Sequence, residues 1–198
     1  MTNSRSLPEA EAANRNREVV EASLQAADEL GCEVDFVSRS DSTLRGHYPL
    51  EPDAITGVLT TRGEAIDGVI LVPAFGEAGR ITVDGIHYAG NDRDGYAPVG
   101  DSEFARDATF GYASSDLRDW VAEKSGGRIP RNEVGLIRLD DLRGDRDAVV
   151  AQLLGGAEVI AVDIVEETDL RALALSLAEA ETKGSGSSSE SARRSSAP

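Results

Sequence analysis

The sequence predicts an α/β fold with an open, mainly parallel sheet and helices on both of its faces. Three observations predict this class. Apolar runs of strand length alternate with segments of helical periodicity. Residues 68–72 are continuously apolar and end before Pro73, which is typical of a strand buried on both faces of a parallel sheet. The length of 198 residues suits one domain with a single core.

The first half of the chain predicts two helices and two strands. Apolar residues at helical spacing predict a helix over residues 8–30, which ends at Gly31. We expect a short strand over residues 34–38 and then a polar run that leads into a second helix reaching about Thr61, with Pro49 in its first turn. The next strand is the apolar run at 68–72. Residues 74–114 are rich in glycine and carry brief apolar pieces, so we expect a long, loop-rich connection there.

The second half continues the alternation. Ser115 or Asp116 can cap a helix that reaches Lys124. The pattern then predicts a strand, a helix, a strand and a helix over residues 134–139, 145–154, 158–162 and 168–180. The last segment is Gly, Ser and Arg with almost no apolar residue, which predicts disorder. The sequence thus predicts a domain over residues 3–182 and a disordered tail over residues 183–198.

Charge and composition exclude several classes of protein. Asp and Glu number 36 against 20 Lys and Arg, and the net charge of -16 repels nucleic acid and anionic membranes. No segment approaches the roughly 20 apolar residues of a membrane-spanning helix. The N-terminus lacks the apolar core of a secretory signal, and Cys32 has no second cysteine to pair with, so we expect a cytoplasmic protein. An acidic surface poor in lysine indicates a halophilic source, with an arginine-rich, high-GC genome as the alternative.

The first candidate ligand site is the polar run Ser40-Asp41-Ser42-Thr43-Leu44-Arg45-Gly46. It follows a predicted strand and opens a predicted helix, and ligands of open α/β sheets bind at that edge. Asp41 can accept from hydroxyls, Ser42 and Thr43 can donate, and Arg45 can hold a carboxylate in a bidentate fork. The alternative is a plain helix cap that binds no ligand.

The second candidate run also follows a buried strand, and it reads Val72-Pro73-Ala74-Phe75-Gly76-Glu77-Ala78-Gly79-Arg80. If the strands of Phe36 and Ile70 are neighbours, Arg45 and Arg80 lie over the same edge of the sheet and can face one small anion. The alternative is that Arg80 forms a surface ion pair with Glu77 or Glu103.

A third run, Asp101-Ser102-Glu103-Phe104-Ala105-Arg106-Asp107, completes a specific pattern. In order, the three runs resemble the N-terminal, substrate-binding domain of the four-carbon acid sugar kinase family, and the resemblance covers about residues 3–180. His47, Gly76 and Ser102 stand where that family usually has Asn, Pro and Thr. The family also carries an upstream acidic motif and a Gly-rich C-terminal domain that binds ATP, and neither is in this sequence.

The resemblance implies the substrate-binding portion of an ATP-dependent kinase that phosphorylates threonate, erythronate or a 3-oxo-tetronate. Arg45 and Arg80 would neutralise the carboxylate and Asp41, Ser42 and Thr43 would orient hydroxyls. The substrate-binding set is completed by Gly46, Phe75 and Gly79. The resemblance implies that ATP and Mg²⁺ are bound by a domain absent here. A separately encoded ATP-binding lobe is one expected partner, and we expect the chain to be inactive without it.

Two alternatives stay open: a non-catalytic module that binds a small acid sugar, and a truncated relic. His47, His87 and Cys32 lack the spacing of metal ligands, and no phosphate-binding loop or hydrolase triad has a local signature. We therefore predict no metal site in this chain and assign no catalytic residue.

Overall fold

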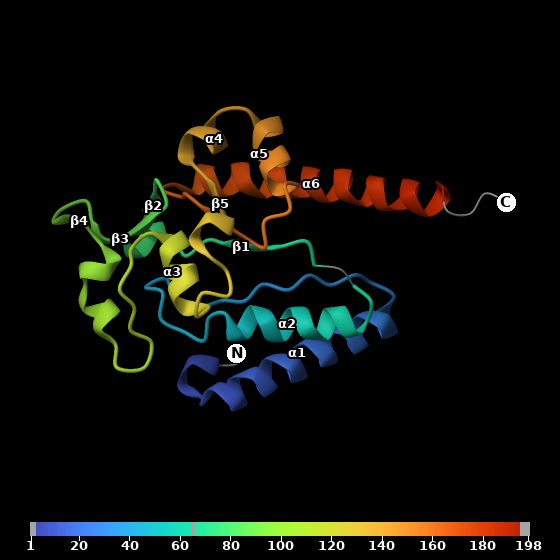
Figure 1. Ribbon diagram of the computed structural model, residues 1–198, viewed down its shortest axis with the longest axis horizontal. Coiled ribbons are helices and arrows are strands. Elements are labelled where there is room, and N and C mark those ends of the chain that lie inside the picture. Colours follow the sequence, from blue (N-terminus) through green and yellow to red (C-terminus); the bar gives the residue numbers. More distant parts are fainter. Residues whose placement is uncertain (1–2, 65, 195–198) are drawn as a thin grey trace.

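The structure, a computed structural model, describes residues 3–64 and 66–194 and contains two three-stranded sheets (Figure 1). The first sheet is parallel, with the order β1-β6-β5. Its strands are β1 (Val69–Leu71), β5 (Val134–Ile137) and β6 (Val159–Val162). In its register, Val159 lies opposite both Val69 and Val134. The predicted α/β class with a parallel sheet is confirmed.

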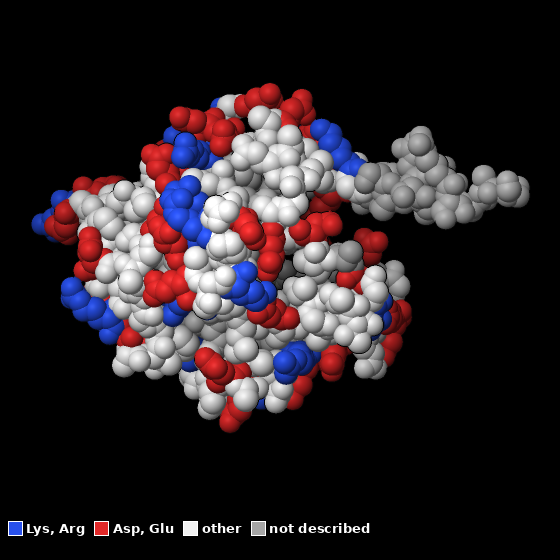
Figure 2. Space-filling model, viewed as in Figure 1, with Lys and Arg blue, Asp and Glu red and all other residues white. Residues whose placement is uncertain are grey.

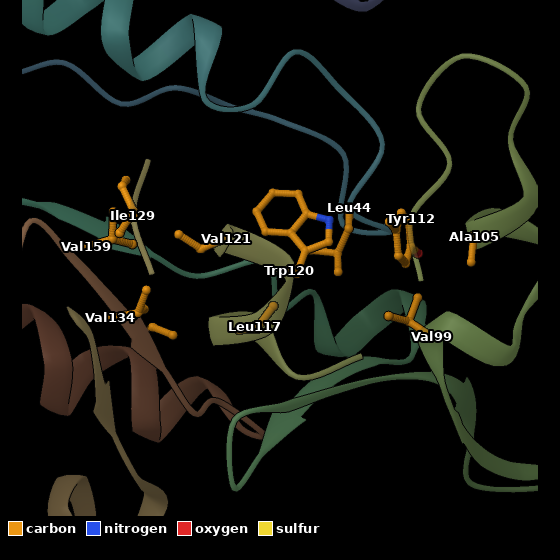
Figure 3. Packing of buried hydrophobic residues seen from close by; sticks show 11 residues of the cluster. Leu44, Val99, Ala105, Tyr112, Leu117, Trp120, Val121, Ile129, Val134 and Val159 are labelled. Carbon is orange, nitrogen blue, oxygen red and sulfur yellow. The ribbon is translucent and has the colours of Figure 1, made fainter. Parts of the chain in front are cut away.

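Helices cover both faces of this sheet, as predicted. Alternate residues of β6 point to opposite sides, so Val159 and Ala161 join one apolar cluster and Ile160 and Val162 join another. The first cluster contains Trp120 of α3 (Leu117–Lys124), and Figure 3 shows its buried residues. The second lies against α4 (Leu139–Arg143), α5 (Arg146–Leu153) and α6 (Glu167–Arg194). Strand β6 is therefore buried along its whole length.

Two helix starts follow directly from the sequence. The Asp116 carboxylate accepts from the backbone N–H of Arg118 at 2.9 Å and caps α3. Asp145 does the same for α5 by accepting from the N–H of Asp147 at 3.0 Å. A side-chain acceptor at this position satisfies a donor that the first turn leaves free. Asp116 was one of the two caps predicted for α3, and Asp145 is the residue at which the next helix was predicted to begin.

The expectation of a long, loop-rich connection over residues 74–114 is wrong, because these residues contain a second sheet. Its order is β2-β3-β4, it is antiparallel, and its strands are β2 (Arg80–Val83), β3 (Ile86–Asn91) and β4 (Gly95–Pro98). Asp84 and Gly85 join β2 to β3 with φ of 52° and 79°. Positive φ at both turn residues is the geometry of a tight hairpin, and Gly85 adopts it without strain.

The two sheets are joined at the end of β6. Thr82 and Ile164 exchange backbone hydrogen bonds of 2.9 and 3.1 Å. The buried Asp163 carboxylate accepts from the N–H groups of Asp84 and Gly85 at 2.7 and 2.8 Å. Burial raises the pKa of Asp163, while these N–H donors favour the charged form. The β2–β3 turn is therefore fixed to the parallel sheet.

The N-terminal part is a separate helical layer, in which α1 (Glu9–Leu30) packs along α2 (Leu50–Thr61) (Figure 1). The strand predicted at residues 34–38 is wrong: in the described part of the chain, this segment joins neither sheet. Val34 and Phe36 instead pack against the α1–α2 cluster. Their alternation with polar residues suits one-sided burial, and here a helix pair supplies the apolar surface.

The remaining elements are short 3₁₀ turns and a long C-terminal helix. The turns are η1 (Ser4–Ser6), η2 (Gly76–Ala78), η3 (Val99–Asp101), η4 (Glu103–Arg106) and η5 (Arg131–Glu133). Helix α6 continues to Arg194, through most of the segment predicted to be a disordered tail, and residues 195–198 of that tail lie outside the described residues. None of the helices in the described ranges has both the length and the apolar character needed to cross a membrane.

Candidate functional site

Loop 41–46 is organised around the Asp41 carboxylate. One oxygen of this carboxylate accepts from the Thr43 backbone N–H at 2.7 Å and also from the Thr43 hydroxyl. The other accepts from Arg45 at 3.2 Å and from Arg5. Arg45 also donates from Nε to the Thr43 hydroxyl at 2.9 Å. Three of the predicted site residues, Asp41, Thr43 and Arg45, are therefore in direct contact.

Buried side chains fix the position of loop 41–46. Leu44 has a φ of 62°, unusual for a non-glycine residue, and its side chain lies in the first apolar cluster (Figure 3). The Tyr112 hydroxyl donates to the Thr43 carbonyl at 2.7 Å, and burial raises the pKa of Tyr112 to about 12. At Gly46 a Cβ atom would lie 2.5 Å from the Ser40 hydroxyl, so a larger residue there would require the Ser40 side chain to rotate away. The loop is fixed before any ligand arrives.

His87 of β3 supports the same loop and is fully buried. Its Nε2 lies 2.8 Å from the Ser42 carbonyl oxygen and its Nδ1 lies 2.9 Å from the Thr82 hydroxyl. Burial is the main reason that the pKa of His87 falls to about 4. The ring is therefore neutral at pH 7, donates from Nε2 to Ser42, and accepts at Nδ1 from Thr82.

The start of α2 corrects one expectation about this loop. Helix α2 begins at Leu50, so its first turn does not present free N–H groups at residues 40–46. That turn carries Glu51 and Asp53, whose negative charges complement the helix dipole. Loop 41–46 can bind an anion through its arginine, and the helix N-terminus adds nothing there.

The N-terminal segment packs on the outside of the loop. Besides the Arg5–Asp41 ion pair, the Ser4 hydroxyl donates to the buried Glu51 carboxylate. His47, which could have been solvated, is buried, and its Nε2 lies 2.9 Å from the Leu7 carbonyl oxygen. These contacts tie the chain before α1 to the candidate site.

The second predicted run forms a tight turn that presents Arg80. Phe75 and Arg80 exchange backbone hydrogen bonds of 2.8 and 3.0 Å. Between them, Gly79 has a φ of 68°, and a Cβ there would lie 1.6 Å from the Gly90 carbonyl oxygen. The Arg80 guanidinium donates to the Ala78 carbonyl at 2.6 Å, while the Phe75 ring stays half exposed.

Arg45 and Arg80 meet at one aromatic ring. The Arg45 guanidinium carbon lies 5.0 Å from the centroid of the Phe104 ring, and the Arg80 guanidinium carbon lies 5.1 Å from it. Both distances are within cation–π range. The predicted convergence of the two arginines is therefore present, although the strand pairing of Phe36 with Ile70 that we expected to cause it is not.

The two arginines differ in their charge partners. Arg45 lies between Asp41 and Asp107, at 3.2 and 3.7 Å. Backbone N–H groups hold the pKa of Asp107 below its usual range, with a smaller effect from Arg45. Within the described residues Arg80 has no ion pair, so it pairs with neither Glu77 nor Glu103, and its buried Nε lacks a hydrogen-bond partner. Arg80 therefore keeps an uncompensated positive charge in a protein whose visible face carries much acidic surface (Figure 2).

A surface hollow of about 460 Å³ lies beside Arg80. Most of its lining is polar backbone and side chain, and it is formed by residues 76–80 and 90–92 and by Tyr96. Its lining includes the acidic residues Glu77 and Asp92 but neither Arg45 nor Phe104. One of its walls is the predicted run that contains Gly79 and Arg80.

Several residues of this site were missed by the sequence analysis. Phe104 and Asp107 lie in the third run, which was noticed as a pattern without a role for either residue. Arg5 and His87 are separated in sequence from the loop they contact. The sequence signal for Phe104 and Asp107 was the third run itself. The signal for His87 was a polar residue within an otherwise apolar strand pattern.

Comparisons with known proteins found a matching family model, a related sequence and related structures. The model of a family described as a sugar-binding N-terminal domain matches residues 1–192. The chain is 30% identical over 177 residues to a D-erythronate kinase of Heliobacterium modesticaldum. That match covers 87% of this chain and 36% of the relative, so the chain spans little more than a third of the relative's length.

Solved structures share the fold. A Haemophilus influenzae protein superposes with a TM-score of 0.66 at 22% identity, over 88% of this chain and 40% of that one. A domain of unknown function from Bordetella bronchiseptica, solved with bound citrate as a domain-swapped dimer, gives a TM-score of 0.62 at 26% identity. It is covered over 38% of its length and this chain over 88%.

Proposed function

The chain belongs to the family of sugar-binding N-terminal domains, and from that premise we propose that it is the substrate-binding portion of an ATP-dependent kinase. The proposed substrate is a four-carbon sugar acid of the threonate, erythronate or 3-oxo-tetronate class. The D-erythronate kinase relative supports this substrate class. Because the chain spans 36% of that relative, the kinase activity itself is part of the proposal.

The observation that carries the proposal is the free charge of Arg80 beside Arg45. A sugar acid has one carboxylate and several hydroxyls, so its site needs a cation without a strong internal partner. Arg80 meets this need, and its guanidinium faces the same ring as the Arg45 guanidinium. Planar guanidinium groups bind carboxylates through paired hydrogen bonds.

Loop 41–46 supplies the polar groups for the hydroxyls. A carboxylate has about four lone-pair sites, so Asp41 can accept from a substrate hydroxyl while it keeps its contact with Thr43. Ser42 and Thr43 are held in place by His87 and Tyr112 through their carbonyl groups. A loop fixed in this way loses little entropy when ligand binds. Phe75, Gly79 and Gly46 shape the surrounding turns.

Phosphoryl transfer needs ATP and Mg²⁺, and we propose that a separate ATP-binding lobe binds both. Across residues 3–64 and 66–194, no group of three or more His, Cys, Asp or Glu side chains gathers as a metal site. Asp41 and Asp107, the acids beside Arg45, are engaged by arginine and backbone donors. These residues do not fit a magnesium site, so this chain's part in transfer is to bind and orient the acceptor.

Isothermal titration with D-erythronate, D-threonate and citrate tests the binding. We expect the four-carbon acids to bind to the parent chain, and we expect Arg80→Gln to lower their affinity. Phosphate transfer from labelled ATP is then measured with the chain alone and with an added ATP-binding lobe. Transfer that needs both parts supports the kinase; binding without transfer in the mixture identifies a non-catalytic module. A folded chain that binds none of these acids contradicts the proposal.

The cellular setting is also part of the proposal. ATP-dependent sugar-acid phosphorylation belongs in the cytoplasm, and the net charge of -16 suits a protein that works in concentrated salt. Detection of the protein in the soluble cytoplasmic fraction of its source cells tests the location.

A further inference from the structure

The Phe104 ring is where three distant segments of the chain meet. It lies on η4, and its two cationic neighbours come from loop 41–46 and from the start of β2. Its centroid lies 5.0 Å from the Arg45 guanidinium carbon and 5.1 Å from that of Arg80. One ring is therefore a shared contact of both arginines.

The Phe104 ring can offset part of the charge repulsion between the Arg45 and Arg80 guanidinium groups. Two guanidinium groups that contact the same ring carry like charges, and acidic partners that offset their repulsion also occupy the donors that an anion needs. Arg45 already has Asp41 and Asp107 as partners. An aromatic face attracts a cation while forming no hydrogen bond with its N–H groups, so it stabilises Arg80 without removing its donors.

Other contacts of Arg80 fit the same picture. One Nη donates to the carbonyl oxygens of Ala78 and Gly79 at 2.6 and 3.3 Å, which directs the guanidinium from its own turn. The buried Nε has no hydrogen-bond partner among the residues that the structure describes. The side chain is thus held by backbone carbonyls on one side and by the ring, with donor capacity left over.

We propose that Phe104 is the positioning residue for the anion site: its ring holds Arg45 and Arg80 together so that both can act on one substrate carboxylate. This inference rests on the proposed function, because the anion is the carboxylate of the sugar acid. Phe104 acts through the two guanidinium groups and need not touch the reacting atoms.

The test compares an aliphatic with an aromatic replacement. Phe104→Leu keeps an apolar side chain and removes the π face, while Phe104→Tyr keeps that face. We expect Phe104→Leu to weaken D-erythronate binding about fivefold to tenfold and Phe104→Tyr to stay within about twofold of the parent. Phe110→Leu is the matched control, because Phe110 contacts the edge of the His47 ring rather than an arginine. We expect the control to bind like the parent.

A second measurement separates positioning from a general loss of structure. In an Arg80→Gln background, Phe104→Leu should weaken binding by a smaller factor than in the parent, because one of its two targets is gone. Melting curves confirm that each variant is folded. Equal factors in both backgrounds, or no rescue by tyrosine, would overturn the positioning role while leaving the proposed function intact. If the parent itself binds no sugar acid, the proposed function fails first and this inference with it.

Discussion

His87 and Ser42 are joined by a hydrogen bond of 2.8 Å between a fully buried imidazole and a backbone carbonyl of the candidate site. The bond connects the antiparallel sheet to the loop that carries Asp41 and Arg45. Because the partner is a carbonyl oxygen, the bond needs a proton on Nε2, and Nδ1 is then free to accept from Thr82 in the neutral ring. The binding loop is therefore held in part by one buried residue outside it.

The first prediction concerns the pH dependence of stability. The pKa of His87 is about 4 in the folded protein and about 6.5 in the unfolded chain. The stability from the neutral ring is fully present above pH 6.5 and is lost as pH falls toward 4, because the unfolded chain takes up the proton. The slope is up to about 1.4 kcal/mol per pH unit.

Urea titrations of the parent and of His87→Gln at pH 7.5, 6 and 5 measure this effect. The variant should be less stable at pH 7.5 by about 1 to 3 kcal/mol, the scale of a lost buried hydrogen bond. Its stability should also fall less than the parent's between pH 6 and pH 5. Parallel pH curves for the two proteins would contradict the assignment.

The second prediction separates the two arginines. Arg80→Gln should weaken sugar-acid binding by about 1.5 to 3 kcal/mol, the scale of a charge-assisted hydrogen bond, and Arg80→Lys should recover part of this. Arg45→Ala should weaken binding on the same scale and also lower the melting temperature, because it removes the cation that pairs with Asp107 and one of the two that pair with Asp41. Titration calorimetry and thermal melts measure both effects. Unchanged affinity in folded Arg80→Gln would show that Arg80 does not bind the carboxylate.

The third prediction concerns the turn that presents Arg80. Gly79→Ala should destabilise the protein by more than about 2 kcal/mol, because the new Cβ would lie 1.6 Å from the Gly90 carbonyl oxygen and the turn must open. Gly31→Ala is the matched control: its φ is 64° against 68° for Gly79, and nothing lies within 4 Å of its Cβ. The control should cost about 1 kcal/mol. Equal costs would mean that backbone strain alone sets the effect.

The fourth prediction concerns salt. A net charge of -16 repels itself, and the Debye length shrinks from about 10 Å at 0.1 M to about 3 Å at 1 M salt. The melting temperature should therefore rise with potassium chloride. Scanning calorimetry over this range of potassium chloride measures the rise. A melting temperature that does not depend on salt would remove the electrostatic argument.

Local signals in the sequence predicted the parts of the fold that depend on neighbouring residues. The cap Asp116 is one of the two that the pattern offered, and the apolar runs that became β1 and β6 were recognised because each run is continuous. The strand prediction at residues 34–38 failed because a strand needs a hydrogen-bonded neighbour. Alternation of apolar and polar residues does not show whether the apolar side chains pack on a sheet or on a helix pair. For β2 and β3 the signal was present: Asp84-Gly85 between alternating apolar residues is a strong hairpin pattern.

The candidate site divides in the same way. Asp41, Thr43 and Arg45 are close in sequence, and their mutual contacts follow from a local turn. Phe104 could not be predicted as the meeting point of Arg45 and Arg80, because that contact depends on the tertiary packing of three segments. Asp107 was recognised as part of the third run, but its ion pair with Arg45 could not be predicted from the sequence.

The Asp163 carboxylate has a consequence for the slow motions of the molecule. The amides of Asp84 and Gly85 lie in a hairpin turn, a kind of place where hydrogen exchange is usually fast, yet both donate to a buried oxygen at the end of β6. They can exchange only when that end of the parallel sheet opens, so their protection against deuterium should match the core amides of β6 rather than the neighbouring turn at residues 91–95. The amides of this hairpin turn should therefore exchange as slowly as amides in the core of the protein.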